Sequence, residues 1–131
     1  MNEIVWIMAQ TIPDFPLEQN LAITSAFAER GMFRFSEACE YVRNLPYGRT
    51  TNRAELLLVL KEGRGTCSSK HALLAALARE NAQPVKLMLG VFLLNAKLMP
   101  EVKYVLEKYQ LDVVPEVHTY LVWCGERFDF T

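Results

Sequence analysis

The side chains best suited to nucleophilic chemistry in this 131-residue chain are its three cysteines. Cys67 is the candidate nucleophile, because it follows Gly63 and Gly65 and opens a leucine- and alanine-rich stretch that predicts a helix. A helix N-terminus favours a thiolate and points unpaired N–H groups toward the oxygen of an attacked carbonyl. The glycines leave little side-chain bulk over the thiol. The alternative is a capped, buried cysteine, which is a common place for a free thiol.

A catalytic thiol needs a base, and the base needs an acceptor that orients it. The stretches 117–123 and 126–131 predict two strands joined by a two-residue turn at 124–125. In that hairpin, His118 and Asp129 share one face as diagonal neighbours, about 7 to 8 Å apart between Cα atoms. An imidazole and a carboxylate span this gap. The alternative is a half-buried strand histidine and a solvated carboxylate.

His71 offers a second interpretation of the same helix, since it lies one turn after Cys67. As a base it would have no orienting carboxylate nearby, so a packing or hydrogen-bonded histidine is the default expectation. A metal site from Cys67, His71, His118 and Cys124 is conceivable by residue type. These residues lack the two close ligand pairs that are typical of structural zinc, and we expect neither a metal nor another cofactor.

The other two cysteines are expected to stand outside the chemistry. Cys39 lies in a predicted helix beside two glutamates, whose charges raise the pKa of a thiol and favour a structural role. Cys124 lies in the predicted turn. The second oxyanion donor is open between Tyr47 and Asn52, and either residue can equally be an ordinary turn or cap residue.

The elements that must position these residues follow from the hydrophobic spacing. Helices are expected at 17–30, 37–44 with Ser36 as N-cap, 52–61, 67–81 and 100–109, and strands at 85–93, 117–123 and 126–131, the second of these separated from the preceding helix by Pro115. Helices first and antiparallel strands afterwards predict an α+β fold, with the nucleophile on a central helix packed on a small antiparallel sheet. The length and the 51% apolar content predict one domain over residues 1–131.

The composition of the chain excludes some classes of binding partner. A formal net charge of -1, without a block of like charges, excludes a general nucleic-acid binder. The apolar runs are far shorter than the roughly 20 residues of a membrane-spanning helix. Residues 1–10 show no basic leader, so we expect a cytoplasmic protein without a membrane partner. The oligomeric state stays open.

The spacing around these residues resembles a known family. Its core motifs correspond to Gly65, Cys67, Leu73, Arg79, Pro84, Lys86 and Gly90, then to His118 with Tyr120 and to Asp129 with Thr131. The region 47–131 thereby resembles the transglutaminase-like superfamily of papain-type thiol enzymes. Ala82 stands where the family has glycine, Ser69 where an acidic residue is frequent, and Lys86 where it has arginine. Residues 95–116 form an insertion whose helix is a candidate lid or substrate-selecting wall.

The resemblance implies a chemistry and a role for each residue. Cys67 would be the nucleophile, His118 the base and acid, and Asp129 the orienting residue. The implied reaction is acyl transfer or hydrolysis on an amide through a thioester, with a peptide, a protein or a small amide as substrate. Peptidase, amidase, deamidase and transglutaminase outcomes all fit. The alternative is a catalytically silent domain that binds a peptide or protein partner.

Overall fold

The computed structural model describes residues 12–131 and has the α+β architecture expected from the sequence. The elements are α2 (Ala22–Ala28), α3 (Phe35–Arg43), α4 (Leu58–Glu62), α5 (Cys67–Glu80), β1 (Lys86–Leu94), the 3₁₀ helix η2 (Pro100–Val102), α6 (Lys103–Tyr109), β2 (Val114–Trp123) and β3 (Glu126–Phe128). The expectation of a missing leader falls on residues 1–10, which lie outside the described residues. A single domain over the whole chain stays a prediction.

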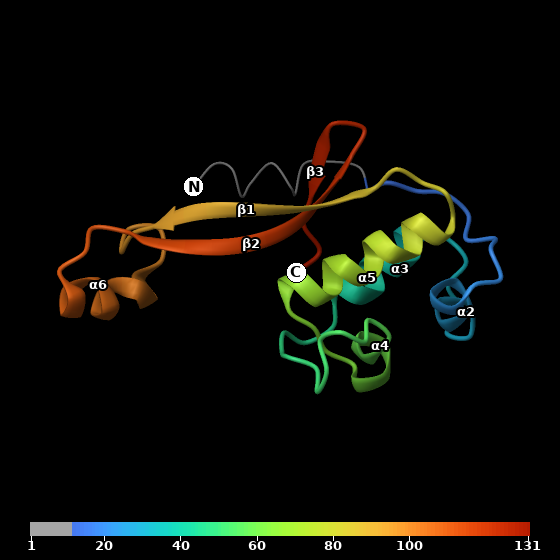
Figure 1. Cartoon of the computed structure of the whole chain (residues 1–131), viewed down its shortest axis with the longest axis horizontal. Helices are drawn as coiled ribbons and strands as arrows, with labels where there is room; N and C mark the ends of the chain where they lie inside the picture. Colours follow the sequence, from blue (N-terminus) through green and yellow to red (C-terminus); the bar gives the residue numbers. More distant parts are fainter. Residues whose placement is uncertain (1–11) are drawn as a thin grey trace.

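Helix α5 is the centre of the fold, as expected. It contacts α2, α3 and α4 on one side and β1 and β2 on the other (Figure 1). Its small and branched apolar residues are almost completely buried: Leu73, Leu74, Ala75, Leu77 and Ala78. Alanines let the neighbouring elements approach closely, so the helix serves as the core of the molecule.

The sheet is antiparallel, with the order β1-β2-β3. Trp123 pairs with Glu126, and Cys124 and Gly125 both have positive φ, of 52° and 78°, which confirms the predicted two-residue turn. The returning strand was predicted too long, because β3 ends at Phe128. The next residues turn toward α5 instead of continuing the ladder with β2.

Two predicted helix starts were wrong because distant side chains take the N–H groups. The first helix begins at Ala22 rather than residue 17, since the N–H groups of Glu18 and Gln19 donate to the Asn81 side chain. Ser36 is not an N-cap. It lies inside α3, whose N-cap residue is Arg34, and its N–H donates to Asp14. Asp14, 22 residues away in the sequence, therefore accepts an N–H group that a local cap residue was expected to accept.

Two further boundaries differ from the sequence expectation. The helix predicted at 52–61 is shortened to α4, because the Asn52 side chain accepts the N–H of Ala54 in a local turn. Pro115 lies inside β2, opposite Leu93, rather than before the strand. The short β3 does not reach this part of β2, which leaves a free edge where proline is tolerated.

Beyond the helices, β1 and β2 run on as a two-stranded ribbon with α6 at its far end (Figure 1). Its apolar side chains are largely exposed, among them Leu89 (66%) and Val91 (65%). The 95–116 insertion supplies η2, α6 and the start of β2. Within residues 12–131, none of the helices is both long and apolar enough to cross a membrane.

Candidate active site

Cys67 is the first residue of α5, as predicted, and its thiol is partly buried. Thr66 caps the helix: its side chain accepts the N–H of Ser69, and the Ser69 hydroxyl accepts the N–H of Thr66 in return. This reciprocal cap uses Ser69, the residue where the family often has an acid. The N–H groups of Cys67 and Ser68 lie in the first turn, where a helix provides no carbonyl to accept them. Among the residues that the structure describes, no acceptor takes these two N–H groups, so they can stabilise an oxyanion beside the thiol.

Two neighbouring residues of β2 meet the Cys67 sulfur. The Thr119 hydroxyl donates to Sγ at 3.4 Å, and His118 lies near enough for its charge to act on the thiol. Burial opposes ionisation, but the hydrogen bonds from Thr119 and the charge of His118 outweigh it and lower the pKa of the Cys67 thiol. Sequence reasoning missed Thr119, because strand alternation predicts that only one of two adjacent residues faces a given partner.

His118 and Asp129 come together, with 2.6 Å between His118 Nε2 and Asp129 Oδ2. The other carboxylate oxygen, Oδ1, accepts the N–H and the hydroxyl of Thr131 at 2.9 and 2.6 Å. Burial works against the carboxylate charge, yet these hydrogen bonds lower the pKa of Asp129 to about 2. The hydrogen bond to Asp129 in turn raises the pKa of His118, against the effect of burial. Both shifts favour an imidazolium beside a carboxylate.

The imidazole of His118 is oriented by its surroundings on the sheet. Gly90 pairs with His118 across β1 and β2, and the ring of Phe92 lies 5.8 Å from the imidazole centroid. Because Nε2 is used by Asp129, Nδ1 is the nitrogen left for the Cys67 thiol. The structure therefore brings the three sequence-predicted site residues into one connected arrangement.

His71 lies beneath this arrangement, fully buried and without access to a substrate. Its Nε2 accepts the N–H of Phe130 at 2.7 Å and lies 3.5 Å from Asp129 Oδ1. Burial lowers the pKa of His71 to about 4, so the ring is neutral at pH 7. The bond to Phe130 holds the residue that follows Asp129, which is a supporting role rather than that of a base for Cys67.

Lys70 supports the same segment from the neighbouring position on α5. Its side chain is almost fully buried, and Nζ donates to the carbonyls of Leu45 at 2.7 Å and Thr131 at 3.4 Å. A Cβ at Gly65 would come within 2.8 Å of Lys70 Cγ. Gly65 therefore makes room for Lys70, whereas the sequence suggested that it clears access to the thiol. Nothing in the local sequence pattern marked a buried lysine here.

A groove of about 280 Å³ runs along the thiol. Its lining comes from the 47–53 loop, the start of α5 and the start of the His118 strand: Tyr47, Arg49, Thr50, Arg53, Thr66, Cys67, Ser68, Ser69, Glu116 and Val117. Of the two candidate oxyanion donors, Tyr47 lines this groove and Asn52 does not. Within the described residues, the insertion reaches the groove through Glu116 and not through α6.

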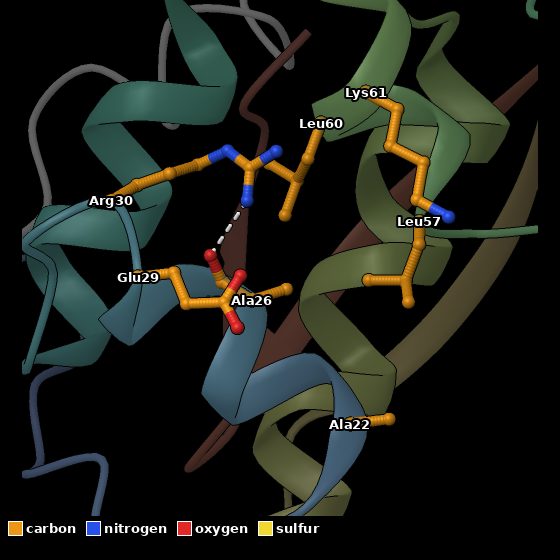
Figure 2. Close-up of a pocket in the computed structure, with 7 residues that line it drawn as sticks. All are labelled: Ala22, Ala26, Glu29, Arg30, Leu57, Leu60 and Lys61. Atoms are coloured by element: carbon orange, nitrogen blue, oxygen red, sulfur yellow. Dashed lines mark hydrogen bonds between the residues drawn. The ribbon is translucent and has the colours of Figure 1, made fainter.

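A second hollow, of about 240 Å³, lies between α2 and α4 (Figure 2). Its polar groups are Glu29, Arg30 and Lys61, and Arg30 donates to the carbonyl of Ala26. No cysteine or histidine lines it. Of these two hollows, the groove beside Cys67 is the one that combines a nucleophile with polar groups.

The other cysteines stand apart from the groove. Cys39 is completely buried in α3, and burial together with the charge of Glu40 raises the pKa of its thiol well above the usual value. Cys124 is exposed in the hairpin turn. Among residues 12–131, no cluster of three or more metal-binding side chains was found.

Comparison with known proteins gives one match. The family model described as the transglutaminase-like superfamily matches residues 20–124, which include Cys67 and His118 and end before Asp129. No curated protein and no solved structure matches the chain.

Proposed function

The chain belongs to the transglutaminase-like superfamily, and we propose that it is a thiol enzyme in which Cys67, His118 and Asp129 catalyse acyl transfer or hydrolysis on an amide. The observation that carries this proposal is the 2.6 Å hydrogen bond between His118 and Asp129, beside a thiol of lowered pKa. A base oriented in this way, next to a nucleophile at a helix N-terminus, is the arrangement that thiol catalysis requires.

In the first step, the Cys67 thiolate forms a C–S bond with the substrate carbonyl carbon. The carbonyl electron pair moves to oxygen, and the N–H groups of Cys67 and Ser68 are positioned to stabilise this charge. Tyr47, which also lines the groove, is the candidate second donor. The C–N bond then breaks as His118 passes its proton to the departing amine.

In the second step, the thioester on Cys67 is resolved. His118, now neutral, accepts a proton from water or from a second amine as that group attacks the thioester carbon. The C–S bond breaks, and the thiolate and the imidazolium are restored. Asp129 holds the ring orientation and stabilises its positive charge throughout, so the same residues serve hydrolysis and transfer.

Cysteine-specific labelling tests the proposal. With limiting iodoacetamide at neutral pH, peptide mass spectrometry should find Cys67 modified at least about tenfold faster than Cys124, because Thr119 and His118 favour the Cys67 thiolate. His118→Ala should remove most of that advantage. Equal rates at Cys67 and Cys124, or an unchanged rate in His118→Ala, would contradict the triad.

An acyl probe tests turnover. Incubation with 4-nitrophenyl acetate should leave an acetyl group on Cys67 and release nitrophenolate beyond one equivalent. Cys67→Ser should abolish both, and Cys124→Ser is the matched control that should change neither. A reactive Cys67 that forms no acyl adduct would instead favour a silent, peptide-binding domain.

A further inference from the structure

The wall of the groove that the 47–53 loop forms carries two arginines, Arg49 and Arg53. Their loop is held at both ends of its turn. Gly48 N–H donates to Gly65 carbonyl at 3.1 Å, and Thr51 N–H donates to the Glu62 carboxylate at 3.1 Å. The loop is therefore fixed against the residues that lead into Cys67, and its two arginines line the same hollow as Cys67.

These arginines differ from others in their charge environment. Arg34, Arg43 and Arg64 form ion pairs, with Asp14, Glu40 and Glu62 respectively. Within residues 12–131, neither Arg49 nor Arg53 has a hydrogen bond or an ion pair. Glu62 is the acid that hydrogen-bonds this loop, and its carboxylate already accepts hydrogen bonds from Thr51 and Arg64. The groove thus presents two uncompensated positive charges on this wall.

The rest of the lining fits the same kind of ligand. Thr50, Thr66 and Ser68 add hydroxyl groups that can donate to an anion. The single acid of the lining, Glu116, lies on the β2 wall. A substrate carboxylate is therefore attracted to the arginines of the loop and repelled by Glu116 on β2. These charges favour one orientation of a bound substrate.

We propose that Arg49 and Arg53 select substrates that carry a carboxylate close to the carbonyl attacked by Cys67, as in an acidic peptide. This inference rests on the proposed function, since it takes Cys67 as the nucleophile. Arginine suits the role because its planar guanidinium donates two parallel hydrogen bonds to a carboxylate. The groove would also concentrate anionic substrates over neutral ones.

A matched pair of reagents tests the selection at Cys67 itself. The thiolate displaces iodide from both iodoacetate and iodoacetamide, and the two differ in charge. The measured quantity is the rate of Cys67 alkylation by iodoacetate divided by the rate with iodoacetamide. In Arg49→Gln/Arg53→Gln this ratio should fall by about threefold to tenfold, and in the native protein it should fall as salt rises. A change in thiol pKa affects both reagents alike and cancels in the ratio.

Two control variants separate the groove from general charge. Arg30→Gln/Arg79→Gln removes the same net charge outside the lining and should leave the ratio within about twofold, because surface charges at a distance are screened. Glu116→Gln should raise the ratio. Far-ultraviolet circular dichroism confirms that each variant is folded.

The outcomes distinguish the two proposals. If Cys67 stays the fastest thiol with iodoacetamide but the ratio is unchanged in the Arg49/Arg53 variant, the carboxylate selection is wrong and the triad stands. An equal fall in the Arg30/Arg79 control likewise overturns the selection. If Cys67 reacts no faster than Cys124 with either reagent, the proposed function itself fails.

Discussion

The two ends of the β1–β2 ribbon have opposite environments. At one end, β2 packs on α5, and the junction formed by Lys70, His71, His118, Thr119 and residues 129–131 is tied by hydrogen bonds from several elements. At the other end, the arm formed by 89–94, 95–113 and 114–117 exposes most of its apolar side chains, apart from Leu94 and Leu106. Both ends are rich in apolar residues. Packing against α5, rather than composition, therefore separates the two ends, and the arm contributes to the site only where it adjoins the junction, through residues such as Phe92 and Glu116.

The largest contrast is expected from truncating one leucine at each end. Leu77 is completely buried in α5, so Leu77→Ala should lower the free energy of unfolding by about 2–5 kcal/mol through lost contacts and a cavity. Leu89 is 66% exposed on the arm, and Leu89→Ala should change it by less than about 0.5 kcal/mol. Urea denaturation followed by tryptophan fluorescence measures both. Similar losses would mean that the arm is covered in solution.

A smaller effect is expected from the buried bond beneath the site. His71→Leu keeps most of the side-chain volume but leaves the N–H of Phe130 without its acceptor, which should cost about 1–3 kcal/mol of unfolding free energy. Because Phe130 follows Asp129, the rate of Cys67 alkylation by iodoacetamide should also fall. His71→Gln, which retains an acceptor, should recover part of that rate. A full rate in His71→Leu would show that the junction does not position Asp129.

Acid should weaken the junction through Asp129. Its pKa is about 2 in the folded protein and 3.8 ordinarily, so the folded state holds the carboxylate more strongly in its charged form. The resulting stability is present above pH 3.8 and is lost as the pH falls toward 2, by roughly 2 kcal/mol in total. Urea midpoints measured between pH 5 and 2 should show this decline. Asp129→Asn should flatten it, and an equal decline in that variant would assign the effect elsewhere.

The smallest effect on stability is expected in the connection between α5 and β1. Ala82 has a φ of 56°, in the left-handed region, at the position where the family has glycine. Ala82→Gly relieves this strain but adds freedom to the unfolded chain, so a net gain of about 0.5–1 kcal/mol is expected. Thermal unfolding followed by circular dichroism measures it. A loss of stability would show that the backbone relaxes around alanine.

Local patterns in the sequence were enough for several features that the structure contains. The start of α5 at Cys67 follows from glycines before a leucine- and alanine-rich run, and the turn at Cys124 and Gly125 follows from the short break between two strands. The alternation along the hairpin predicted that His118 and Asp129 would meet, but the ladder ends at Phe128, and the packing of residues 129–131 on α5 completes their hydrogen bond. The helix start and the turn depend on contacts within a helix or a hairpin, so their signal lies within a few neighbouring residues.

The tertiary structure alone decided what surrounds the thiol and what holds Asp129. Thr119 reaches Cys67 across 52 residues, Phe130 reaches His71 across 59, and Thr131 reaches Lys70 across 61. Asp129 leaves the ladder because Phe130 is buried and bonded to α5. The hydrogen bond between Gly48 and Gly65 holds the loop that carries Arg49 and Arg53 beside the residues that lead into Cys67. Such contacts arise only when separate elements pack, and no periodicity along the chain encodes them.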